Sequence, residues 1–110
     1  MDGISLTAVA GEQLARARDA HSGRAAHTVH GGHDRALRQT VIALTAGHAL
    51  AEHESPGDAT LQVLLGRVRL TAGEHTWEGA TGEFAAIPPV RHALTAVADS
   101  AVLLTVLTPR

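Results

Sequence analysis

Histidine is the residue type in this sequence with the clearest chemical potential, because an imidazole ligates divalent transition metals. The chain contains eight histidines and no cysteine, so thiolate ligands and disulfides are excluded. His27, His30 and His33 lie within seven residues and could present one or two imidazoles to a metal. Residues three apart on a strand face opposite sides, so these three do not form one ready-made site. Exposed histidines on a strand and its turn are the simpler interpretation.

A second group of polar residues surrounds His53. Glu52, Glu54 and Asp58 flank this histidine. In an alternating strand the immediate neighbours of His53 point away from it, whereas Asp58 lies in a loop and could fold inward. Carboxylates near a histidine could form an acid and base pair. Nothing in this spacing demands such a pair, and solvated turn carboxylates are the commoner outcome.

Other chemistries lack their motifs in this sequence. No Gly-x-Ser-x-Gly turn is present to carry a hydrolase nucleophile. Gly31-Gly32 lacks the lysine and the helix that follow a phosphate-binding loop. The net charge is −2 and the acidic and basic residues are interspersed, so there is no basic stripe for a phosphate backbone. Nucleic acid is therefore not an expected partner.

The chain of 110 residues is long enough for one domain with one modest core. Trp77 and Phe84 are the only aromatic residues, so the core must consist of Ala, Val, Leu and Ile. A marginal core of small side chains favours dimerisation. The N-terminus lacks the segments of a signal peptide, and the longest apolar run, near residues 101–107, is too short to cross a bilayer. We expect a cytoplasmic homodimer without membrane contact.

Periodicity indicates which elements position the candidate residues. Between Ser5 and Ala20, apolar residues recur on one face of a helix, and Ser5 or Thr7 could cap its start. Beyond Gly23, short apolar runs alternate with turn residues roughly every eight to twelve positions, which is typical of an all-β barrel. Leu61 to Leu65 has apolar residues on both faces, which indicates contact with a second layer or subunit. The expected strands are 25–30, 36–44, 60–65, 67–71, 75–78, 84–87, 92–97 and 101–107.

Two segments resemble the two consensus motifs of the cupin superfamily. They are Gly47-x5-His53-Glu54-Ser55-x3-Ala59-x6-Gly66 and Gly82-x5-Pro88-Pro89-Val90-Arg91-His92. The resemblance covers residues 35–107, and this segment is similar to the small single-domain cupins of actinobacteria. It implies an all-β, double-stranded β-helix (jelly-roll) barrel with a short N-terminal α-helix. Residues 1–23 would form the helical arm and residues 24–110 the cupin barrel.

The resemblance also implies a metal site, which this sequence retains only in part. In metal-binding cupins the first motif supplies two histidines and a glutamate, and the second motif supplies the last histidine. His53 matches the first ligand and His92 the last, whereas Ser55 replaces the second histidine and Ala59 replaces the carboxylate. A hydroxyl and a methyl group cannot replace an imidazole and a carboxylate. We therefore expect a degenerate metal site, with His30 as the first candidate for a further ligand.

Two functions follow from this inventory. The first is a non-catalytic barrel that binds or senses a small molecule. Its binding residues would be His53, Ser55, Leu61, Val63, His92 and Leu94. The second is a metal-dependent cupin enzyme, of the oxygenase or isomerase type, in which His53, His92 and a further ligand hold the metal. The expected cofactor is none or a weakly bound divalent ion of Zn, Ni, Mn, Fe or Cu, and the ligand count favours the first function.

Overall fold

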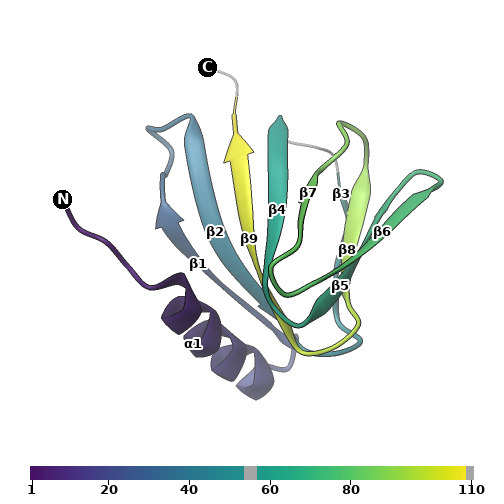
Figure 1. The fold of residues 1–110 in the computed structure, drawn as a ribbon, viewed down its shortest axis with the longest axis horizontal. Coiled ribbons are helices and arrows are strands. Elements are labelled where there is room, and N and C mark those ends of the chain that lie inside the picture. Colours follow the sequence, from purple (N-terminus) through teal and green to yellow (C-terminus); the bar gives the residue numbers. More distant parts are fainter. Residues whose placement is uncertain (54–56, 109–110) are drawn as a thin grey trace.

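The computed structural model describes residues 1–53 and 57–108, with the backbone alone for Glu52 and His53. Within these residues, one helix precedes two antiparallel sheets (Figure 1). The elements are α1 (Leu6–Asp19), β1 (Arg24–His30), β2 (Leu37–Leu44), β3 (Ala49–His53), β4 (Asp58–Leu65), β5 (Arg67–Ala72), β6 (His75–Ala80), β7 (Phe84–Ala86), β8 (His92–Ala96) and β9 (Ser100–Leu107). Sheet A has the strand order β1-β2-β9-β4-β7, and sheet B has the order β3-β8-β5-β6. The expected all-β barrel with a short N-terminal helix is confirmed.

Helix α1 covers part of the outer face of sheet A. Ser5 caps the helix, since its hydroxyl oxygen accepts a hydrogen bond from the backbone N–H of Ala8 at 3.1 Å. Figure 1 shows α1 beside β1 and β2, and its apolar stripe packs onto the sheet there. The buried residues of this helix cluster are Ala10, Leu14, Ala17, Val41, Ala43, Ala101 and Leu103. The apolar stripe of the helix is therefore covered within one chain.

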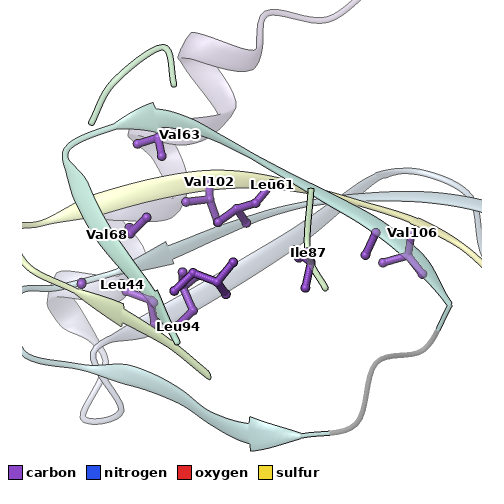
Figure 2. Packing of buried hydrophobic residues seen from close by; sticks show 11 residues of the cluster. Leu44, Leu61, Val63, Val68, Ile87, Leu94, Val102 and Val106 are labelled. Atoms are coloured by element: carbon purple, nitrogen blue, oxygen red, sulfur yellow. The ribbon is translucent and has the colours of Figure 1, made fainter. Parts of the chain in front are cut away.

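A second, aliphatic cluster fills the space between the two sheets (Figure 2). It includes Leu44, Ala59, Leu61, Val63, Val68, Leu94, Ala96, Val102 and Val106, and the partly buried Trp77 packs against it. In β4, Leu61 and Val63 face this core, whereas Leu64 lies on the opposite face by alternation, and a bulge between Val63 and Leu65 turns Leu65 toward the helix cluster as well. The two apolar faces expected of residues 61–65 are thus both covered by the chain itself.

One strand was not among those expected from the sequence. It is β3, which forms the edge of sheet B and runs antiparallel to β8. Its register pairs His53 with His92, after an irregularity that follows the pair of Leu50 and Leu94. The segment that carries the first motif is therefore paired directly with the strand that begins at the last residue of the second motif.

A bulge in β1 corrects the expectation for the histidine cluster. His27 pairs with Val41, and after the bulge His30 pairs with Gln39. Because Val41 and Gln39 share one face of β2, His27 and His30 lie on the same face of the sheet. The expectation that residues three apart face opposite sides is wrong here. The shared face is the outer one, on which Val41 contacts the helix cluster.

The chain crosses from sheet A to sheet B at Gly66, which has a φ of 89°. A side chain at this position would also collide with the backbone of Asp99 and Ser100, so glycine is required. Ser100 is 1% exposed, and its hydroxyl oxygen accepts a hydrogen bond from the backbone N–H of Arg67 at 3.0 Å. This hydroxyl therefore joins the start of β9 in sheet A to the start of β5 in sheet B.

Asp99 joins three segments close to the same crossover. Its carboxylate accepts hydrogen bonds from the backbone N–H of Ala46 at 2.9 Å and from Nε of Arg18 at 3.0 Å. The backbone N–H of Ala46, and then the Arg18 guanidinium, hold the pKa of Asp99 below its ordinary value. The end of helix α1 is thereby attached to the turns that precede β3 and β9.

Part of the outer face of sheet A remains uncovered by the helix. Leu37 and Leu107 are direct cross-strand partners there, with 41% and 49% of their surface exposed. These side chains and the exposed Phe84 of β7 are a structural basis for the expected homodimer, because the helix stripe and residues 61–65 are already buried within the chain. In the described part of the chain, no helix is long and apolar enough to cross a membrane.

Candidate functional site

A small cavity, which we call the central cavity, lies between the two sheets and has a volume of about 30 Å³. Such a volume accommodates about one water molecule. The lining consists of His92 and the aliphatic residues Ile42, Leu50, Leu61, Leu70, Ile87, Leu94 and Leu104. Three residues named from the sequence, Leu61, His92 and Leu94, therefore lie at one cavity. Val63 is completely buried in the same core but does not line this cavity.

His92 is the polar residue of the central cavity. Alternate residues of β8 are buried, which directs His92 between the sheets along with Leu94 and Ala96. Only 4% of His92 is exposed, and its Nδ1 lies 2.9 Å from the carbonyl oxygen of Val90. A carbonyl can only accept, so Nδ1 donates this hydrogen bond.

The other residues singled out by the resemblance lie in different parts of the fold. His53 is the last residue of β3 and the backbone partner of His92, and Ser55 lies outside the described residues. Ala59 is 7% exposed and belongs to the core between the sheets. A methyl group therefore faces the barrel at the position where the resemblance expects a carboxylate. His30 is exposed on the outer face of sheet A, so the structure does not bring it to His92.

The described residues do not fit a transition-metal site. A divalent transition metal requires at least three protein ligands from imidazole, carboxylate or thiolate groups. Among the side chains that the structure describes, no three His, Asp or Glu residues approach closely enough to hold a metal ion. Ala59 supplies no donor atom, and the sheet itself separates His30 from the barrel interior.

Two wider pockets adjoin the central cavity on the inner face of sheet A. One has a volume of about 200 Å³ and is lined by Arg38, Thr40, Ile42, Leu104 and Val106. The other has a volume of about 360 Å³ and is lined by Ser22, Arg24, Ala25, Ala26, Thr40, Ile42 and Leu50. Ile42 lines all three spaces, so we call them together the barrel mouth. The β2 lining of the barrel mouth was missed in the sequence, although Arg38, Thr40 and Ile42 alternate there as residues of one strand face should.

Comparison with known proteins shows which fold this geometry shares. No protein-family model and no curated protein matches the chain. The solved structure of a conserved protein of unknown function from Streptococcus pyogenes matches with a TM-score of 0.74 and 30% identity, over 83% of this chain and 79% of that one. A cupin superfamily protein from Desulfitobacterium hafniense matches with a TM-score of 0.71 and 17% identity, over 78% of each chain. KdgF from Halomonas sp. matches with a TM-score of 0.70 and 19% identity, over 84% of this chain and 86% of that one. Taken with the two-sheet barrel, these matches show that the chain has the fold of small cupin proteins.

Proposed function

We propose that this cupin binds or senses a small organic molecule in its barrel mouth, without a resident metal. One observation carries the proposal: the barrel interior is aliphatic around His92, with Ala59 buried at the position of the family's carboxylate. Pockets that are mostly apolar and contain a few placed polar groups are typical of small-molecule sites.

The sizes of the spaces indicate where such a molecule would lie. The central cavity, at about 30 Å³, is too small for an organic ligand. The adjoining pockets of about 200 and 360 Å³ are large enough for one, and they open beside Ile42. We therefore place the ligand along the inner face of β2, with its innermost part directed toward His92.

A metal-dependent enzyme of the oxygenase or isomerase type is the second candidate. It is favoured by one observation, the direct pairing of His53 with His92 in the β3–β8 register. Two imidazoles alone would leave the other coordination positions to water and would lack the charge neutralisation that a carboxylate provides. This pair would therefore bind a divalent ion weakly, which is why we rank the metal-free function first.

Metal analysis of tag-free protein, purified without a nickel column, tests the choice between the two. We expect well under one metal ion per chain, and the same small change in thermal midpoint on adding Zn²⁺ for the native protein and for His53→Ala. A stoichiometric metal that survives dialysis against a chelator would overturn the proposal and support the enzyme.

A gain of metal binding provides the complementary test. The double substitution Ser55→His with Ala59→Glu supplies the two ligands that the resemblance finds missing, so it should raise Zn²⁺ affinity by orders of magnitude. The matched control is the double substitution Ser55→Ala with Ala59→Gln. It changes the same two positions, and glutamine is similar in volume to glutamate but has no carboxylate. Equal Zn²⁺ affinities of the two variants would contradict the ligand assignment.

A further inference from the structure

Arg38 is the cationic residue that the fold places on the inner face of sheet A at one end of the barrel mouth. In β2, alternation directs Arg38, Thr40 and Ile42 to the same side as Leu44, which belongs to the core between the sheets. Arg38 accordingly lines the pocket of about 200 Å³, together with Leu104 and other residues. Its guanidinium is available to whatever occupies that pocket.

The strand register places Arg38 in the same cross-strand row as Ala59, which stands where the resemblance expects a carboxylate ligand. Arg38 pairs with Val106 of β9, and Val106 pairs with Ala59 of β4. Arg38 therefore lies two strand spacings, about 10 Å, from the residue that replaces the family's carboxylate. In this cross-strand row, Ala59 supplies no carboxylate, whereas Arg38 supplies a positively charged guanidinium. Such a charge repels a divalent cation and attracts an anion.

Other groups near the barrel mouth also favour an anionic ligand. The hydroxyl oxygens of Thr28 and Thr40 lie 3.3 Å apart, so one donates to the other, and the accepting hydroxyl keeps its own proton for a ligand. Among the described residues, Arg38 takes part in no ion pair. The described lining of the barrel mouth contains Arg24 and Arg38 but no Asp or Glu. The charge of this lining is therefore positive.

We propose that the barrel mouth binds an organic carboxylate with an apolar tail. The carboxylate lies on Arg38 and the hydroxyl of Thr40, and the tail runs along Ile42, Leu104 and Val106 toward the central cavity. A planar guanidinium matches the two oxygens of a carboxylate with parallel hydrogen bonds. This inference rests on the proposed function and names the chemical class of its ligand.

NMR titration of the ¹⁵N-labelled protein tests the inference, with the amide shifts of β2 and β9 as the readout. The probes are hexanoate, octanoate, 1-hexanol and hexylammonium. Hexanoate should bind roughly tenfold more tightly than 1-hexanol, because hydrogen bonds to charged groups are the stronger ones, and hexylammonium should bind most weakly. Octanoate should bind roughly tenfold more tightly than hexanoate, because two more methylenes are buried.

Three arginine variants locate the effect. Arg38→Gln should abolish the preference for hexanoate over 1-hexanol. Arg16→Gln is the matched control, since Arg16 is exposed on helix α1, outside the barrel, and forms no ion pair within the described residues. It should leave the preference unchanged. Arg24→Gln, at the other end of the barrel mouth, should retain most of the preference.

The possible failures are distinguishable. Equal affinities of the native protein for hexanoate and 1-hexanol would overturn the carboxylate assignment and leave the proposed function standing. A preference that disappears in Arg24→Gln and persists in Arg38→Gln would overturn the role of Arg38. If none of the four probes changes the amide chemical shifts of β2 and β9, both the inference and the proposed function are overturned.

Discussion

Replacing Ser100 with alanine tests how the two sheets are joined around the barrel interior. The Ser100 hydroxyl accepts a hydrogen bond from the backbone N–H of Arg67 at 3.0 Å and lies 2.7 Å from the carbonyl oxygen of Ala98, to which it donates. It also lies 2.9 Å from the carbonyl oxygen of Arg67. A hydroxyl has a single proton, and the Arg67 carbonyl already accepts from the backbone N–H of Val97. Alanine would therefore remove one donated and one accepted hydrogen bond.

The expected cost follows from these two bonds. Loss of the bond to Ala98 removes about 1 kcal/mol, and leaving the partly buried N–H of Arg67 without an acceptor costs about 1–3 kcal/mol. We expect the free energy of unfolding to fall by about 2–4 kcal/mol. For a domain of this size, such a change lowers the Tm by roughly 10–15 °C.

Urea denaturation followed by Trp77 fluorescence measures this free energy. Ser22→Ala is the matched control, because the Ser22 hydroxyl makes one long contact, 3.4 Å to the carbonyl oxygen of Arg24, at an exposed position. The control should change the free energy of unfolding by no more than about 0.5 kcal/mol. If Ser100→Ala also stays within about 0.5 kcal/mol of the native protein, the hydroxyl does not hold the crossover and the reasoning is refuted.

Three further substitutions test other features of the fold. Gln13→Leu should raise the free energy of unfolding by about 1 kcal/mol in urea, because Gln13 is 4% exposed and its Oε1 has no hydrogen-bond partner among the described residues; a decrease would show that the amide stabilises the helix interface. Asp99→Asn should lower the urea midpoint at pH 7, since it removes the charge that pairs with Arg18. The lowered pKa of Asp99 means that its contribution is present above about pH 3.9 and is lost as the pH falls through the lowered value, so the two midpoints should converge in acid. A difference that is unchanged in acid would contradict this titration. Leu37→Glu with Leu107→Glu should convert the expected homodimer to a monomer in sedimentation at micromolar concentration, and a native protein that is already monomeric would refute the homodimer.

The elements with local signals were predictable from the sequence. Helix α1 was predictable because the cap at Ser5 and the apolar spacing that follows it are properties of one short segment. The crossover at Gly66 was recognisable as a turn for the same reason. The resemblance singled out Ala59 and His92, and the structure places both of them between the sheets.

The features that depend on distant partners were not predictable. A bulge is defined by the register of two strands, so the one between Thr28 and His30 could not be recognised without β2. One extra residue changes the face of each later side chain, which is why His30 lies outside the barrel. Arg38 was missed for another reason. An arginine near the start of a strand suggests a solvated side chain until the facing sheet is known.

The helix cluster shows how a chain with so few aromatic residues can still order its core. Ala10 and Ala17 of α1 belong to the same buried cluster as Ala43 and Ala101, which are cross-strand partners, and all four are 0% exposed. An alanine side chain has no rotamers to lose on folding, whereas a buried leucine or methionine loses about 0.5–2 kcal/mol of conformational entropy. Docking of the helix is therefore opposed by little side-chain entropy. A larger residue at one of these four buried positions would have to displace its neighbours, which typically costs about 1–3 kcal/mol.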